Sequence, residues 1–106
     1  MTYDELVRFA AGKLAVEIAY ADDGMGWQYM SEDHEGWWDF YLTSPDLFLK
    51  GLAACPHYKA LVIYTPQIEG DDTMIKMYVG KSLKMCKKPS EIPFTFWQCW
   101  AEVEGK

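Results

Sequence analysis

The stretch LAVEIAYADDGMGWQYMSEDHEGWWDFYL, residues 14–42, decides the fold prediction. Its three apolar runs are rich in Val, Ile, Trp and Tyr, which favour the pleated surface of a sheet. Two acidic segments that contain glycine separate the runs, and such segments are typical of turns. The stretch therefore predicts a three-stranded meander, although the first run also fits the end of a helix. The expected strands are residues 14–20, 27–30 and 37–42.

Clear helix starts lie on both sides of this meander. Thr2 precedes Glu5 by three residues, a capping-box spacing in which each side chain bonds to a backbone N–H of the other residue. Ser44 is a good N-cap and Pro45 suits the first helical position, where its missing N–H would have no partner. The sequence thus predicts one helix from Thr2 to about Leu14 and a second from Ser44 to Pro56.

The second half adds further strands. Residues 60–64 form a continuous apolar run, which predicts a central strand covered on both faces, and residues 73–79 alternate as a half-buried strand does. We expect a short helix after Ser82 and a last, aromatic-rich strand over residues 94–103. Together these elements predict a single α+β domain over residues 1–106. It would have a single mainly antiparallel sheet of five to six strands, with two helices packed on one face.

Charge is distributed unevenly along the chain. The 106 residues carry a formal net charge of −6, with 16 acidic and 10 basic residues. Residues 17–46 contain eight acidic residues and no Lys or Arg, whereas residues 76–88 contain five lysines and no acid. Such separation creates a directional field that speeds the encounter with an oppositely charged partner.

The acidic segment also carries many aromatic residues. Trp37 and Trp38 point to opposite faces of a strand, so we expect one in the core and the other on the outer face. Exposed Trp beside charge is typical of binding hot spots, although acidic turns can also serve solubility alone. The predicted partner-binding residues are Asp22, Asp23, Trp27, Glu32, Asp33, Glu35, Trp37, Trp38 and Asp39.

A basic protein or ribonucleoprotein is the partner that such a surface predicts. Direct binding of nucleic acid is not expected, because that requires an excess of Lys and Arg. Mimicry of a whole duplex would need more acids than a net charge of −6 provides, since DNA carries about one charge per 1.7 Å of axis. An acidic patch that blocks one basic site on a nucleic-acid-handling complex fits the charge better.

No catalytic or metal-binding motif is evident. Cys55 and His57 have the spacing of a zinc-ligand pair, but structural zinc sites usually need two such pairs. Cys86 lies among lysines, which favour a thiolate, so a small thiol-dependent enzyme is an alternative. The leading expectation is a protein that is not an enzyme and that uses no cofactor and no metal.

The sequence also predicts a location. The N-terminal charges are acidic, unlike those of a signal peptide, and no apolar run reaches the roughly 20 residues that span a membrane. The chain has three cysteines, an odd number that is unusual for a small disulfide-bonded domain. We therefore expect a cytoplasmic protein with free thiols and no membrane association; the oligomeric state stays open.

In size, acidity, aromatic content and absence of catalytic motifs, the chain resembles the small inhibitors encoded by phages and mobile elements. Anti-CRISPR proteins and toxin-neutralising immunity proteins are the two groups it is most similar to. The resemblance is one of type and assigns no residue roles. It implies a protein that acts in the cytoplasm of a host cell. An immunity protein and an adaptor that binds basic or methylated peptides are the remaining alternatives.

Overall fold

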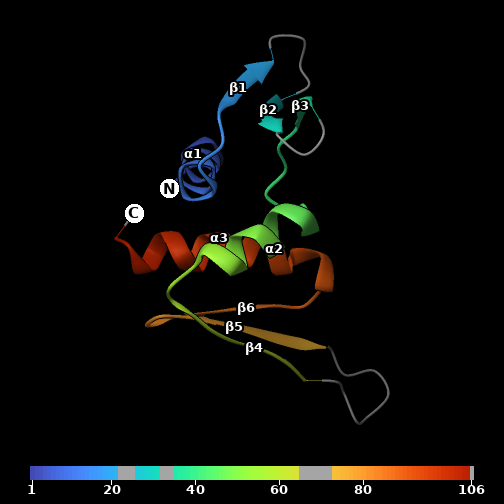
Figure 1. Ribbon diagram of the computed structural model, residues 1–106. Helices are drawn as coiled ribbons and strands as arrows, with labels where there is room; N and C mark the ends of the chain where they lie inside the picture. The colour runs from blue at the N-terminus through green and yellow to red at the C-terminus, as the bar shows by residue number, and fades with distance from the viewer. Residues whose placement is uncertain (22–25, 32–34, 65–72, 106) are drawn as a thin grey trace. The chain divides into compact units, whose positions relative to one another are not determined.

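The computed structural model describes residues 1–21, 26–31, 35–64 and 73–105 (Figure 1). Its contacts group into two compact units, Met1–Ala54 and Cys55–Lys106. This division coincides with the uneven charge. The first unit has ten acidic and three basic residues, a net charge of −7, whereas the second has six acidic and seven basic residues, a net charge of +1.

The first unit begins with helix α1 (Tyr3–Leu14), and its predicted capping box is confirmed. Thr2 Oγ1 accepts a hydrogen bond from the Glu5 N–H over 3.2 Å, and the Thr2 N–H donates to Glu5 Oε1 over 3.3 Å. The two bonds satisfy backbone groups that the first helical turn leaves without partners. The buried side chains of α1 recur at helical spacing: Leu6, Val7, Ala10 and Ala11.

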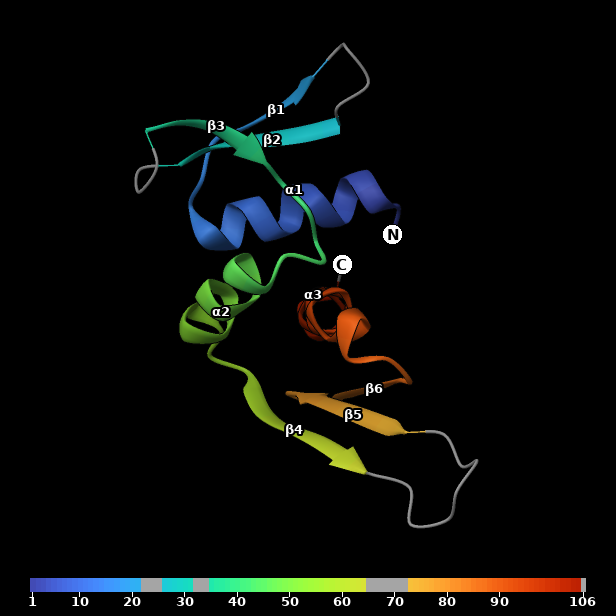
Figure 2. The ribbon, with the colours of Figure 1, turned by 90° about the vertical axis from the view of Figure 1, so that its right-hand side faces the viewer.

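The predicted meander is also confirmed. Strands β1 (Ile18–Ala21), β2 (Gly26–Ser31) and β3 (Gly36–Asp39) form a three-stranded antiparallel sheet in the order β1-β2-β3. Helix α2 (Pro45–Ala54) follows, and its N-cap is as expected, because the Leu47 N–H donates to Ser44 Oγ over 3.4 Å. Figure 2 shows α1 running beneath this sheet.

The second unit is a second three-stranded antiparallel sheet with a helix on one face. Strands β4 (Tyr58–Tyr64), β5 (Met74–Val79) and β6 (Ser82–Cys86) lie in the order β4-β5-β6. A short 3₁₀ turn, η1 (Pro89–Glu91), leads into α3 (Ile92–Val103), which lies along one face of the sheet (Figure 2).

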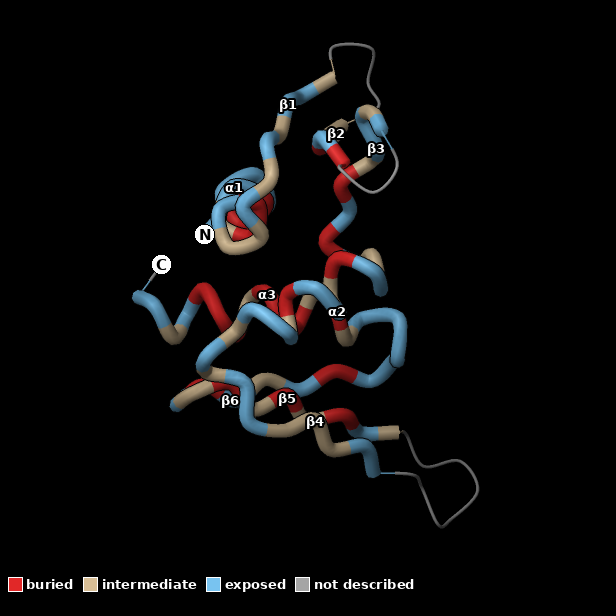
Figure 3. Tube along the Cα trace, viewed as in Figure 1, coloured by how far each residue is buried: buried red, intermediate tan, exposed pale blue. Residues whose placement is uncertain are grey.

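The core of this unit lies between α3 and the central strand β5, which both carry buried residues (Figure 3). Met77 on β5 is fully buried, and its carbonyl oxygen accepts a hydrogen bond from the Cys99 thiol over 3.8 Å. Trp97 and Trp100 stack with their rings 5.6 Å apart, and Phe96 packs edge-on against Trp97 at 5.1 Å. These aromatic side chains make α3 the main source of apolar volume in the unit.

The prediction of one sheet with two helices is wrong. Over the residues that the structure describes, there are two separate three-stranded antiparallel sheets and three α-helices. Residues 60–64 belong to an edge strand, not a central one. Their apolar run is continuous because Leu61 and Ile63 share the face of the buried β5 residues, whereas Val62 and Tyr64 lie on the opposite face.

Two further elements differ from the prediction. The helix expected after Ser82 is strand β6, which a two-residue turn at Gly80 and Lys81 joins to β5. The strand expected over residues 94–103 is helix α3. Its aromatic side chains favour strands, but Pro93 occupies the first turn, where proline suits a helix. Five of its seven buried residues also recur at helical spacing: Pro93, Phe96, Trp97, Trp100 and Ala101.

Candidate functional site

The register of the first sheet separates its residues into two faces. Tyr29 pairs with Trp38, and Met30 pairs with Trp37, so these two pairs project to opposite faces. Tyr29 is buried, and it packs edge-on against Phe40 at 5.7 Å. The face that carries Tyr29 is therefore the inner one, and the face that carries Met30 and Trp37 is the outer one.

Trp27 lies on the inner face and is held by contacts within the unit. Its indole Nε1 donates a hydrogen bond to Asp4 Oδ1 over 2.9 Å. The Arg8 guanidinium lies 5.4 Å from the centre of the ring, and Tyr20 packs edge-on at 5.3 Å. Both Asp4 and Arg8 belong to α1, so Trp27 connects the sheet to that helix.

The outer face combines apolar side chains with acidic ones. Trp37 is 43% exposed and its cross-strand neighbour Met30 is 37% exposed. Asp39 lies two residues from Trp37 on the same face, and the exposed Glu17 is adjacent to Met30, whose N–H donates to the Glu17 carbonyl over 2.9 Å. We call these four residues the acid–aromatic face: Glu17, Met30, Trp37 and Asp39.

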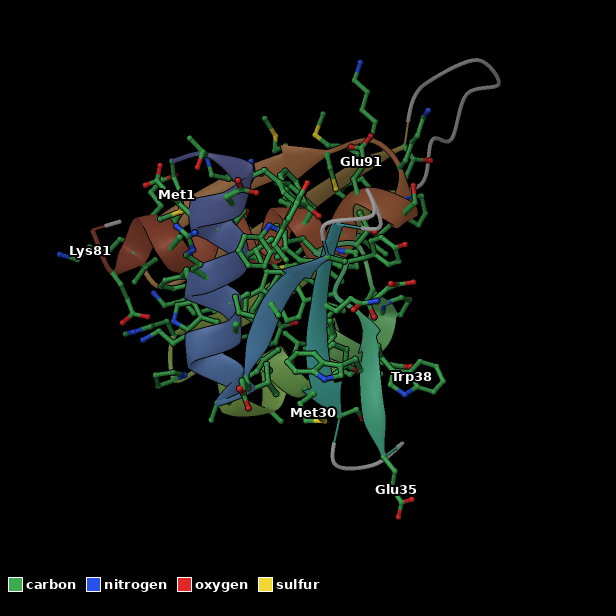
Figure 4. The ribbon with its side chains drawn as sticks, turned by 90° about the horizontal axis from the view of Figure 1, so that it is seen from above. Met1, Met30, Glu35, Trp38, Lys81 and Glu91 are labelled. Carbon is green, nitrogen blue, oxygen red and sulfur yellow. The ribbon has the colours of Figure 1, made fainter. Side chains whose placement is uncertain are left out.

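Neither tryptophan of the Trp37–Trp38 pair is in the core, contrary to expectation. Trp38 is 49% exposed although it lies on the inner face, because β3 is an edge strand. Figure 4 shows its side chain directed away from β3. The buried tryptophans are Trp97 and Trp100 of α3.

The predicted acidic residues are only partly placed. Asp22, Asp23, Glu32 and Asp33 lie outside the described residues. Glu35 is exposed, has a positive φ of 49°, and projects outward just before β3 (Figure 4). Of the nine predicted residues, the structure brings Trp37 and Asp39 together on one face.

Sequence reasoning missed two members of this face, Glu17 and Met30. In the sequence, Glu17 is one of eight acidic residues between residues 17 and 46, and Met30 is the last residue of the predicted strand 27–30. The signal that finds both is the antiparallel register, because a residue and its cross-strand neighbour always share a face.

A hollow of about 720 Å³ opens beside this face. Glu17 and Met30 line it from the sheet, Lys13 from the end of α1, and Leu47 and Lys50 from α2. Its walls thus carry both signs of charge around apolar side chains. A hollow adjacent to exposed apolar residues can accept a partner's side chain, as hot-spot pockets do.

The described residues contain no group of three or more His, Cys, Asp or Glu that could hold a metal ion. Cys86 and Cys99 are buried, and burial raises the pKa of the Cys99 thiol. Within the described ranges, every helix is too short or too polar to cross a bilayer.

Comparison of the chain with protein-family models, with curated proteins and with solved structures finds no match.

Proposed function

We propose that this chain is a non-enzymatic inhibitor, of the type of the anti-CRISPR proteins, that acts by binding a basic protein surface. The partner would be a nucleic-acid-handling protein or ribonucleoprotein, and the acid–aromatic face would block its nucleic-acid-binding site. The observation that carries this proposal is the pairing of exposed Trp37 and Met30 on a sheet of a unit whose net charge is −7.

Two physical roles follow for the members of this face. Trp37 supplies a large apolar surface that a partner can desolvate, which is the usual source of affinity at a hot spot. Glu17 and Asp39 supply negative charge beside it, and charges of this kind mainly accelerate association and select the partner. Met30, with its flexible side chain, adapts its shape to the partner's surface.

The test is a competition assay with a nucleic-acid-binding effector complex and its labelled DNA target. The wild-type chain should prevent DNA binding at low salt, and raised salt should weaken this inhibition. Trp37→Ala should weaken inhibition at least tenfold, as loss of a hot-spot tryptophan typically does. The double variant E17K/D39K should weaken it further, because repulsion replaces attraction.

Leu49→Ala is the matched control, since Leu49 is an exposed apolar residue of the same unit on α2, outside the face. It should inhibit as well as the wild type. Equal inhibition by the wild type, Trp37→Ala and E17K/D39K would contradict the proposal.

A further inference from the structure

The second sheet has an outer face that its own helix does not cover. Helix α3 covers the face of Ile75, Met77 and Val79, which are fully buried. The alternate residues of the same strands point the other way. Met85 is 60% exposed, and Tyr64, Met74 and Leu83 are each about half exposed. We call this outer surface the apolar–lysine face: Val62, Tyr64, Met74, Lys76, Leu83 and Met85.

Lys76 lies at the centre of this face. Its cross-strand neighbours are Val62 on β4 and Met85 on β6, and its Nζ lies 5.2 Å from the centre of the Tyr64 ring. The residues of β4, β5 and β6 include three lysines and no Asp or Glu. Lys84 lies opposite Met77 on the covered face and forms an ion pair with Glu102 over 2.9 Å, so it does not charge the outer face. Lys76 is the charged member of the apolar–lysine face, and apolar side chains surround it.

Contiguous exposed apolar residues of this kind mark an interaction surface. Methionine favours such surfaces because its side chain adapts to different shapes. The occupant that fits has apolar side chains to cover Met74, Leu83 and Met85 and a carboxylate to meet Lys76. A second apolar–lysine face does not fit, because it would place two Lys76 ammonium groups against each other.

The acid–aromatic face has this composition. We propose that the apolar–lysine face of one chain binds the acid–aromatic face of a second copy. Both are outer faces of three-stranded antiparallel sheets, and sheets stack face to face about 10 Å apart. In such a stack Met30 and Trp37 would cover the methionines, and Asp39 or Glu17 would lie within reach of Lys76.

The contact joins two different faces, so its two partners contribute different surfaces. Two such contacts related by a two-fold axis close a dimer, whereas contacts that do not close produce longer assemblies. Because the same acid–aromatic face is proposed to bind the inhibited partner, self-association and inhibition would compete. The self-association itself does not depend on the proposed function, and it is tested with the purified chain alone.

The test is sedimentation equilibrium of the purified chain over a range of concentrations. The weight-average mass should rise above the 12.2 kDa of one chain at low salt and fall back at high salt. Lys76→Glu alone and E17K/D39K alone should each remain at one chain's mass. An equimolar mixture of the two variants should associate again, because each variant retains the face that complements the other.

Two further variants separate a specific contact from general charge effects. Lys81→Glu makes the same charge change on the exposed turn between β5 and β6, outside the face, and should associate as the wild type does. Met85→Ala removes apolar surface without a change in charge and should weaken association at least several-fold. Circular dichroism spectra should match that of the wild type for every variant.

Several outcomes would overturn the inference. One is a wild-type chain that stays monomeric up to millimolar concentration at low salt; another is a mixture of Lys76→Glu and E17K/D39K that does not associate. The third outcome uses a labelled single-stranded oligonucleotide. If the wild-type chain stays monomeric and binds the oligonucleotide, and if Lys76→Glu abolishes that binding, then nucleic acid is the occupant of this face.

Discussion

The indole of Trp27 donates a hydrogen bond to Asp4 over 2.9 Å, and this bond ties strand β2 to the first turn of helix α1. Arg8, one turn further along the helix, covers the same ring. Trp37 lies on the opposite face of the sheet and is exposed. Two tryptophans of one small sheet therefore have different expected roles: Trp27 stabilises the unit, and Trp37 is available to a partner.

Trp27→Phe tests this division. Phenylalanine keeps a ring for Arg8 but has no N–H, so we expect the free energy of unfolding to fall by about 1 kcal/mol, a typical net value for one hydrogen bond. Urea denaturation followed by circular dichroism measures the change. Inhibition in the competition assay should be retained. Trp37→Ala should show the reverse pattern, with stability near that of the wild type and inhibition lost; the same pattern in both variants would contradict the division.

Gly12 and Gly80 form a matched pair for a test of the backbone. Gly12 is helical and a Cβ there would meet nothing within 4 Å, so Gly12→Ala should raise the free energy of unfolding by about 0.5 to 1 kcal/mol. Gly80 has a φ of +56°, and a Cβ there would lie 3.0 Å from Val103 Cγ1. Gly80→Ala should therefore lower the free energy of unfolding, by about 1 to 2 kcal/mol from the left-handed backbone conformation alone.

The double variant G80A/V103A separates the two causes at Gly80. It removes the methyl groups that the new Cβ would contact but leaves the positive φ unchanged. Measured against Val103→Ala alone, Gly80→Ala should then cost less than it does in the wild type, yet still destabilise the fold. Thermal and urea unfolding of the four chains complete this cycle. If G80A/V103A were as stable as Val103→Ala, the positive φ of residue 80 would carry no cost in free energy for alanine.

Local signals in the sequence predict part of this fold. The helix starts at Thr2 and Ser44 were predicted because capping is an interaction between residues three apart, which the sequence shows directly. The meander was predicted for a similar reason, since its strands are neighbours along the chain. What local signals do not encode is whether strands of the first half also pair with strands of the second half. In the described residues each sheet pairs consecutive strands, so two sheets form instead of one.

Helix α3 shows a second limit of prediction from sequence. Phe96, Trp97 and Trp100 favour strands by composition, yet their spacing fits one face of a helix, and tertiary packing against β5 selects the helix.

Among the predicted site residues, Trp37 and Asp39 can be identified from their residue types. Glu17 and Met30 became members of the site only through the cross-strand register.

Acid should weaken the start of α1. Hydrogen bonds from the backbone N–H and hydroxyl of Thr2 lower the pKa of Glu5 below its ordinary value. A carboxyl whose pKa is lower in the folded state stabilises that state above its unfolded pKa, and this contribution is lost as pH falls through the folded pKa. Stability should therefore decline below about pH 4.

Glu5→Gln is the matched control for this pH dependence. Glutamine can keep the capping-box hydrogen bond, but it does not titrate. We expect urea midpoints at pH 3 and pH 6 to differ less in Glu5→Gln than in the wild type. A wild-type difference that is unchanged by Glu5→Gln would show that other carboxylates, not Glu5, cause the acid sensitivity.

The three cysteines should differ in reactivity, and their order tests the thiol-dependent alternative. Burial raises the pKa of Cys99, and Cys86 is buried at the end of β6, whereas Cys55 is half-buried. Because the thiolate is the reactive form, an aromatic disulfide reagent should titrate Cys55 first and the other two thiols only as the chain unfolds. Cys55→Ser should remove the fast phase, and Cys86→Ser should leave both the kinetics of that phase and the inhibition unchanged. Rapid reaction of Cys86 in the folded chain, together with loss of activity in Cys86→Ser, would instead favour chemistry at that thiol, because a surface that acts only by binding has no need of a reactive sulfur.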